Sequence, residues 1–340
     1  MKIYFILILI LIFTNSVKSS PLFDSNFYEI KFNSNNVENT KLKKINEIKY
    51  LSFNKIFKNI LTNNDYLNLN KDINLDLINT FIKNIIFEDE KIINNNYSSK
   101  VKINYNKKKI ITYLRNNNLQ YVEFLPEKFL TIILNQSYIE KNLFSKHNEY
   151  YNFLLSNNFN FYKIPNLDLN DRYLLSHSDI EKKNLYKINK LAEKYKYSDI
   201  LIIISKKNKK NIIYFFYLIT NNQIYPLKNF SQDNINYNEL FLYLKEEVID
   251  LWKINNGIQN KFTNSLNCSI QYFNLFELKE ILKKMNNILI IKRKKLISFS
   301  YKEKLYEISY YGNKKILLKL LNSNGLKFID EKNNCKILLV

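Results

Sequence analysis

The sequence predicts a multidomain protein of mixed α and β structure behind an N-terminal export signal. Strand-like alternation of apolar and polar residues occurs beside helix-like spacing of apolar residues. From Phe129 onward, continuous apolar runs appear, which are typical of strands buried on both faces. The 340 residues exceed what one ordinary core accommodates. We therefore expect an N-terminal α+β unit, a central α/β sandwich with a mixed sheet, and a C-terminal ferredoxin-like domain.

The first residues predict a signal peptide over residues 1–19. Lys2 supplies a positive charge, and Ile3–Phe13 is an unbroken apolar run of eleven residues. As a helix this run would measure about 16 Å, roughly half the thickness of a bilayer core, which is typical of a signal sequence. Cleavage after Ser19 places Val17 and Ser19 at the two positions where signal peptidase needs small residues. We expect a periplasmic mature chain, and an uncleaved N-terminal anchor is the alternative.

The composition indicates a folded, lysine-rich protein. Hydrophobic residues make up 46% of the chain, which is enough to bury cores. The formal net charge is +21, but Arg115, Arg172 and Arg293 are the only arginines, and the lysines are scattered. Such a balance, with abundant Asn and Ile, is what an AT-rich genome encodes at tolerant positions. We expect no nucleic-acid partner, while contact with an anionic membrane or glycan surface stays open.

The first domain, residues 20–125, is expected to be the compact α+β unit. Alternation predicts its strands, and a spacing of three or four between apolar residues predicts its helices. The predicted elements are a strand at 27–33, helices at 40–60 and 75–85, a strand at 97–105, a helix at 108–116 and a strand at 119–124.

The second domain, residues 126–256, is expected to be an α/β domain with helices on both faces of its sheet. Ser178 and Glu181 have the spacing of a capping box, which predicts the start of its second helix. The predicted elements are a strand at 129–134, a helix at 138–156, a strand at 161–164, a helix at 178–195, strands at 199–204, 211–219 and 223–228, and a helix at 235–253.

The third domain, residues 257–340, has the βαββαβ order of a ferredoxin-like fold. Its elements are predicted at 268–273, 275–285, 287–292, 303–311, 313–323 and 326–330, with a last strand at 335–340. Cys268 and Cys335 are the only cysteines. In such a fold the last strand pairs antiparallel with the first: if 335–340 is that strand, the two cysteines lie at its opposite ends, and if 326–330 pairs instead, 335–340 lies one strand further out. Both layouts place the two Cα atoms too far apart for a disulfide. We predict two unpaired, buried thiols.

Few chemistries are compatible with this sequence. With three glycines there is no glycine-rich phosphate loop, and His147 and His177 are the only histidines. We expect no cofactor, no metal and no catalytic residue. The best candidate site is the polar loop with Asp168, Asp171 and Arg172, whose carboxylates could hold a hard cation. The alternative is a structural loop in which Arg172 pairs with one carboxylate, and we favour that internal clamp.

Several segments together resemble the proteobacterial domain-of-unknown-function family numbered 2066, whose members are periplasmic. The signal peptide and the early α+β unit contribute to the resemblance. The other matching segments are Tyr113–Pro126, Ile164–Arg172, Ala192–Tyr195 with Ser198–Leu201, and Tyr311–Asn313 with Leu317, Leu320 and Asn324–Leu326. The middle domain also resembles the N-terminal modules of periplasmic proteins such as the Tol-system propeller protein. Those modules bind other proteins, so the resemblance implies a binding role.

Three functions follow as hypotheses. The first is a non-enzymatic periplasmic protein that binds an envelope protein or the envelope surface. The second is a periplasmic, hydrolase-like enzyme with a site near Asp168, Asp171 and Arg172; a pocket with convergent carboxylates would favour it, and a loop closed by its own salt bridge would oppose it. The third is a secreted factor of an AT-rich eukaryote, which the lack of a disulfide framework opposes.

Overall fold

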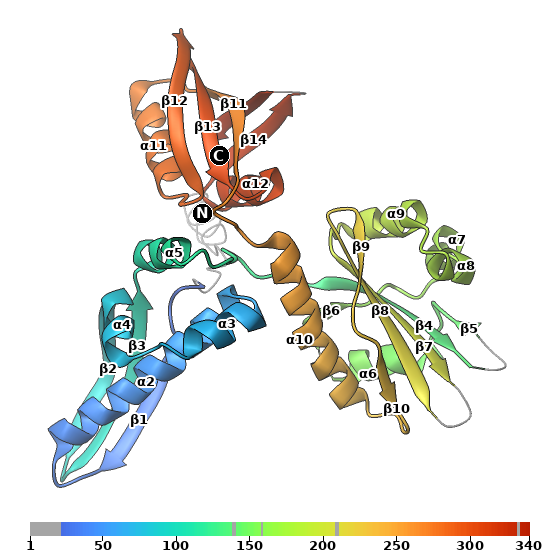
Figure 1. The fold of residues 1–340 in the computed structure, drawn as a ribbon, viewed down its shortest axis with the longest axis horizontal. Helices are drawn as coiled ribbons and strands as arrows, with labels where there is room; N and C mark the ends of the chain where they lie inside the picture. The colour runs from blue at the N-terminus through green and yellow to red at the C-terminus, as the bar shows by residue number, and fades with distance from the viewer. Residues whose placement is uncertain (1–21, 138–140, 158, 208–210, 332–333) are drawn as a thin grey trace, which may run out of the picture. The chain divides into compact units, whose positions relative to one another are not determined.

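The computed structural model describes residues 22–137, 141–157, 159–207, 211–331 and 334–340 (Figure 1). The predicted signal peptide lies outside the described residues. Within them the chain forms 11 helices and three sheets, which confirms the α+β multidomain fold class. Contacts divide it into two compact units, one ending at Leu119 and including Asn286–Leu289, the other formed by the rest. No helix in the described ranges is long and apolar enough to cross a membrane.

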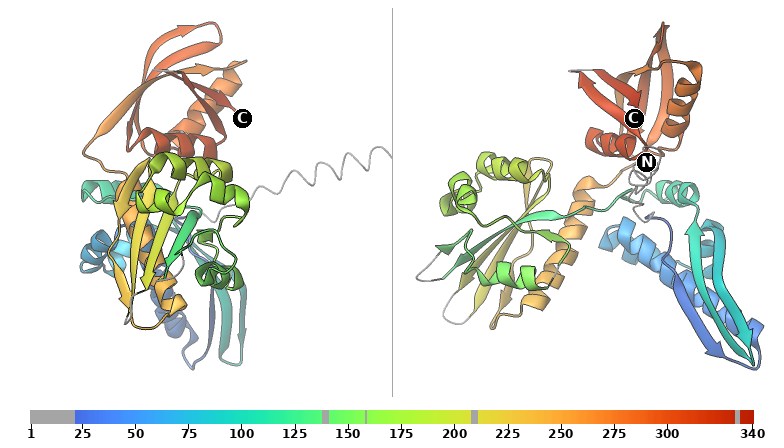
Figure 2. Two further views of the ribbon diagram at one scale, coloured as in Figure 1. Left: turned by 90° about the vertical axis from the view of Figure 1, so that its right-hand side faces the viewer. Right: turned by 180° about the vertical axis from the view of Figure 1, so that it is seen from behind.

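The N-terminal unit is a three-stranded antiparallel sheet covered on one face by a long helix (Figure 2). The strand order is β1-β3-β2. The elements are β1 (Tyr28–Asn33), α2 (Val37–Ile60), α3 (Asn63–Asn70), α4 (Leu75–Phe81), β2 (Ile82–Ile93), β3 (Asn96–Tyr105) and α5 (Lys107–Asn116).

Helix α2 forms because its apolar residues lie on one face and its first turn is capped. The Asn36 side chain accepts the backbone N–H of Asn39, one of the donors that a helix start leaves unsatisfied. Phe53 and Phe57, one turn apart, stack on each other and are wholly buried. Burying one such side chain stabilises the fold by about 1.5–3 kcal/mol.

Two predictions for this unit were wrong. The helix predicted at 75–85 ends at Phe81, and Ile82 begins β2 opposite Tyr105. The isoleucines that suggested helical spacing are β-branched residues, which also suit a strand. The segment 119–124 forms a single bridge at Tyr121 instead of a strand.

The central domain is a seven-stranded mixed sheet with helices on both faces (Figure 1). Its main path is β10-β8-β7-β4-β5, with β6 beside β4 and β9 beside β8. The strands are β4 (Phe129–Gln136), β5 (Lys141–Asn142), β6 (Tyr162–Lys163), β7 (Ile200–Lys207), β8 (Ile212–Thr220), β9 (Gln223–Pro226) and β10 (Phe230–Gln232). The helices are α6 (Glu149–Ser156), α7 (Leu169–Leu174), α8 (His177–Glu181), α9 (Leu185–Tyr195) and α10 (Tyr237–Asn256).

The middle of the sheet is buried on both sides. Strands β4 and β7 run parallel, and β7 pairs antiparallel with β8. Every residue from Phe129 to Leu134 is buried, as the continuous apolar run predicts. Helices α6 and α10 pack on one face through stacked Phe153 and Phe241, and α9 buries Ile188 on the other face.

Two helices of this domain differ from expectation. The region predicted as one helix at 138–156 contains the short strand β5, and α6 begins only after Asn148, whose side chain caps it. The region predicted as one helix from Ser178 is two helices, α8 and α9. The capping serine is Ser176, and its capping-box partner is Asp179.

The C-terminal domain is a five-stranded sheet in the order β12-β13-β11-β15-β14. Its elements are β11 (Thr263–Gln271), α11 (Leu275–Asn286), β12 (Ile291–Ser300), β13 (Glu303–Tyr311), α12 (Lys314–Ser323), β14 (Leu326–Glu331) and β15 (Asn334–Leu339). The expected βαββαβ succession is present, and β15 is added to it.

The prediction of two unpaired thiols was wrong, because the last strand runs in the other direction. Strand β15 lies parallel to β11 and between it and β14. This register places Cys268 directly opposite Cys335, with their Cα atoms 4.3 Å apart. The two form a disulfide, and both cysteines are buried.

Candidate functional site

The predicted polar loop leads into the short helix α7. Asp168 is the N-cap of this helix, and its Oδ1 accepts the backbone N–H of Asp171 at 2.9 Å. This hydrogen bond, followed by the nearby Lys194 charge, lowers the pKa of Asp168, because each favours the ionised carboxylate. The carboxylate of Asp168 is thus engaged in capping the N-terminus of α7.

Asp171 is the centre of the cluster, and its carboxylate is wholly buried. Lys194 Nζ donates to its Oδ1 at 2.7 Å, and Tyr195 OH donates to its Oδ2 at 2.7 Å. A buried carboxylate is tolerated when it is paired and hydrogen-bonded, and both conditions are met here. The hydrogen bond to Asp171 raises the pKa of Lys194.

Tyr195 connects this carboxylate to the loop backbone. Its hydroxyl accepts the backbone N–H of Asn166 at 2.7 Å while donating to Asp171. Burial raises the pKa of Tyr195 to about 12, so the hydroxyl stays protonated and able to donate. Helix α9 therefore closes the loop by two consecutive residues, Lys194 and Tyr195.

Arg172 points away from this cluster. Its Nε donates to the backbone carbonyl of Phe144 at 2.8 Å, and its described contacts include no carboxylate. From the sequence we favoured a structural loop in which Arg172 pairs with one carboxylate. The loop is closed by a salt bridge, but the basic partner is Lys194 and not Arg172.

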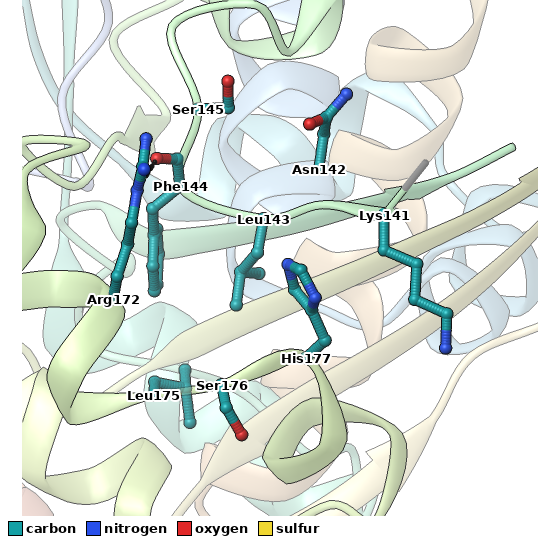
Figure 3. A pocket seen from close by; sticks show the side chains of 9 residues that line it. All are labelled: Lys141, Asn142, Leu143, Phe144, Ser145, Arg172, Leu175, Ser176 and His177. Carbon is teal, nitrogen blue, oxygen red and sulfur yellow. Dashed lines mark hydrogen bonds between the residues drawn. The ribbon is translucent and has the colours of Figure 1, made fainter. Parts of the chain in front are cut away.

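Arg172 lines a pocket of about 320 Å³ in the central domain (Figure 3). In this view Leu143 and Phe144 lie between Arg172 and His177. The nine lining residues contain three basic side chains and no carboxylate. They are Lys141, Asn142, Leu143, Phe144, Ser145, Arg172, Leu175, Ser176 and His177.

The other two basic side chains differ in how they are held. Lys141 Nζ is 2.7 Å from Oε1 of Glu181, so a carboxylate beside the pocket compensates its charge. His177 is the first residue of α8 and is half-buried. Burial, and then the charge of Lys141, lower the pKa of His177, so its imidazole is neutral at pH 7. Arg172 is the basic side chain of the pocket for which no ion pair with a described carboxylate is found.

This arrangement suits recognition of an anionic group better than bond cleavage. The hydroxyl of Ser176 bonds the Asp179 carboxylate at 2.6 Å and accepts that residue's N–H, so it is engaged in the helix cap. Within the described ranges, no group of three or more His, Cys, Asp or Glu residues has the geometry to hold a metal ion. A guanidinium in a partly apolar pocket is suited to binding a carboxylate.

The sequence pointed to the loop but not to all its partners. Asp168, Asp171 and Arg172 do lie together on α7, with the two carboxylates on the Lys194 side and Arg172 on the pocket side. Lys194, Tyr195, Lys141 and His177 were not selected as site residues. One signal was available for two of them, since Lys194 and Tyr195 are adjacent polar residues at the end of an otherwise amphipathic helix.

Comparison with known proteins yields little. No family model and no curated protein matches the chain. Among solved structures, the C-terminal domain of LpoB from Salmonella enterica matches with 12% identity and a TM-score of 0.23. The match covers 33% of this chain and 86% of that one. At this score the match supports no conclusion about shared fold or function.

Proposed function

We propose that this chain is an exported, non-enzymatic protein of the bacterial envelope that binds another periplasmic protein. The observation that carries the proposal is the Arg172 guanidinium, which forms no ion pair with a carboxylate of the described residues and lies in a pocket whose nine described lining residues include no Asp or Glu. An acidic side chain or terminal carboxylate of a partner protein supplies an opposite charge to this guanidinium.

Two independent features support export to the periplasm. The first 19 residues have the charge and apolar run of a signal peptide. The Cys268–Cys335 disulfide is a bond that persists in oxidising compartments such as the periplasm and is rare in the cytosol. The resemblance to the domain-of-unknown-function family 2066 and to Tol-type modules points to the same location.

The alternative, an enzyme with a site at Asp168, Asp171 and Arg172, receives less support. A catalytic carboxylate must face a space that substrate can enter. Asp171 instead contacts Lys194 and Tyr195 inside the domain, and Asp168 caps α7. A secreted factor of a eukaryote is compatible with the disulfide, but the family resemblance favours a bacterium.

The test is crosslinking in the periplasm followed by affinity capture and mass spectrometry, with the parent chain and Arg172→Ala compared. One dominant envelope protein, captured by the parent and reduced at least about tenfold by Arg172→Ala, is expected, since a lost charged contact weakens binding by that factor or more. Lys182→Ala, an exposed cation nearby on the chain that does not line the pocket, is the matched control.

Two outcomes would refute the proposal. Capture of no protein by the parent, with the chain free and monomeric, would remove the binding role and direct attention to substrate screens around Asp168 and Asp171. Capture of the same partner in equal amount by the parent and by Arg172→Ala would show that the Arg172 pocket is not part of the binding surface.

A further inference from the structure

The C-terminal domain presents a projecting hairpin whose end is apolar on both faces. The turn between β12 and β13 extends beyond α11 (Figure 1). Every residue from Lys295 to Tyr301 is exposed, although four of these seven are large and hydrophobic. They are Leu296, Ile297, Phe299 and Tyr301, the last two 76% and 88% exposed. A strand that packs against its own domain buries the side chains of one face. This segment buries neither face, so its apolar side chains do not take part in intramolecular packing.

A second exposed apolar segment lies beside this turn. Tyr272 N donates to the backbone carbonyl of Lys302 at 3.1 Å, which fixes the β11–α11 connection against the end of the hairpin. Phe273 in that connection and Phe276 in the first turn of α11 are 80% and 82% exposed. Leu275 between them is exposed as well. The two segments together form one apolar tip, residues 273–276 and 296–301.

The sequence around the tip is strongly basic. Residues 292–304 contain five lysines and one arginine against a single acidic residue, Glu303. Lys292, Arg293 and Lys295 are exposed on β12 before the apolar residues begin. Phe299 is four positions after Lys295, which is about 13 Å along a strand. Lys302 lies at the turn, with its Nζ 5.2 Å from the centre of the Tyr301 ring.

We propose that this apolar tip docks on the surface of an anionic lipid bilayer. Aromatic side chains at the end enter the boundary between headgroups and acyl chains, which is where Tyr and Phe partition favourably. Lys292, Arg293 and Lys295, which precede the apolar residues on β12, then lie at the level of the lipid phosphates. The distance of about 13 Å from Lys295 to Phe299 is close to the depth at which interfacial anchors are buried. A protein groove would require one shaped apolar face, whereas a lipid surface accepts a tip exposed on both faces.

Charge complementarity selects anionic lipid over neutral lipid. Residues 257–340 carry fifteen lysines and one arginine against six acidic residues. Lysines near a membrane surface are attracted by acidic headgroups, and salt screens that attraction. The inference concerns a different surface from the Arg172 pocket and does not depend on the proposed protein partner.

The first test is sedimentation of the exported chain with vesicles of phosphatidylcholine alone and of phosphatidylcholine mixed with phosphatidylglycerol. Binding is expected only to the mixed vesicles, weakened by added salt. The double variant Phe299→Ser/Tyr301→Ser is expected to bind at least about tenfold less, since each buried aromatic side chain contributes more than the free energy of a tenfold change. Leu169→Ser/Tyr173→Ser, which removes comparably exposed apolar side chains from the central domain, should bind as the parent does.

Insertion can be observed directly with Phe299→Trp. The natural Trp252 is buried in the central domain, so a blue shift of the added emission on mixing with anionic vesicles reports the tip. Equal sedimentation of the parent and Phe299→Ser/Tyr301→Ser, or an unshifted emission from the vesicle-bound Phe299→Trp variant, would overturn the proposal. So would failure of the parent to bind vesicles while the tip variants lose a crosslinked protein partner, because the tip would then be a protein-binding surface.

Discussion

Lys194 and Asp171 form a buried ion pair between α9 and α7, with Nζ 2.7 Å from Oδ1. The carboxylate is inaccessible to solvent, while the lysine side chain is 30% exposed. Removing one partner of the pair is therefore expected to destabilise the fold more than removing the other. Removing the carboxylate leaves a lysine that can turn to water, whereas removing the lysine leaves a buried charge with no counter-ion.

Lys194→Met is accordingly expected to destabilise the central domain by about 1–3 kcal/mol, because Asp171 loses its counter-ion but keeps the Tyr195 hydrogen bond. Urea denaturation followed by circular dichroism measures the change. Lys190→Met, one turn earlier on the same helix and exposed, is the control and should have the parent's midpoint. A midpoint for Lys194→Met equal to that control would mean that the ion pair has no structural role.

The cap of α8 gives a comparison between two serines. Ser176→Ala is expected to cost about 1 kcal/mol, since its hydroxyl accepts the N–H of Asp179 and its own N–H is bonded by the Asp179 carboxylate. Ser178→Ala should have a smaller effect, because Ser178 lies inside the helix. The same denaturation measurement ranks the two. A larger loss for Ser178→Ala would restore the capping box predicted from the sequence.

His177 should make stability depend on pH. Its pKa in the folded state is below the ordinary value of 6.5, so the unfolded chain takes up the proton more readily. Its contribution to stability is complete above about pH 6.5 and is lost as the pH falls below that value and through the lowered pKa. The denaturation midpoint should therefore fall less on acidification in His177→Gln than in the parent. His147→Gln is the control, and the prediction fails if its acid response is flattened as much.

The disulfide should stabilise the C-terminal domain. It closes a loop with a sequence separation of 67 residues, for which loop entropy gives about 4 kcal/mol. Reduction, or Cys268→Ala/Cys335→Ala, is expected to cost about 2–4 kcal/mol. Hydrogen exchange in β11 and β15, with and without reductant, locates the effect. The double variant should not respond to reductant, and identical exchange of the reduced and oxidised parent would contradict the prediction.

The sequence predicted local structure better than long-range pairing. Alternation and apolar runs located β1, β3, β4 and β7, because those patterns reflect burial of individual strands. The partner of Asp171 could not be predicted in the same way. Lys194 is 23 residues away, and only the packing of α9 against α7 brings them together.

The two cysteines are a second case in which long-range pairing could not be predicted from the sequence. Their distance depends on whether the last strand runs parallel or antiparallel to β11, and the residues of β15 favour a strand in either direction. In the structure β15 pairs antiparallel with β14 and parallel with β11, so it lies between them. Because the expected fold did not place the last strand parallel to β11 and beside it, we predicted that Cys268 and Cys335 are too far apart for a disulfide, whereas they form one.

The position of β15 has a consequence for synthesis and transport. Strand β15 follows the other four strands of its sheet along the chain, yet it is an interior strand of that sheet. Until residues 334–339 arrive, β11 has one unpaired edge and Cys268 has no partner. This sheet therefore cannot be completed before residues 334–339 have been synthesised. For the export proposed above, such a delay favours the unfolded state that threading through a narrow pore requires.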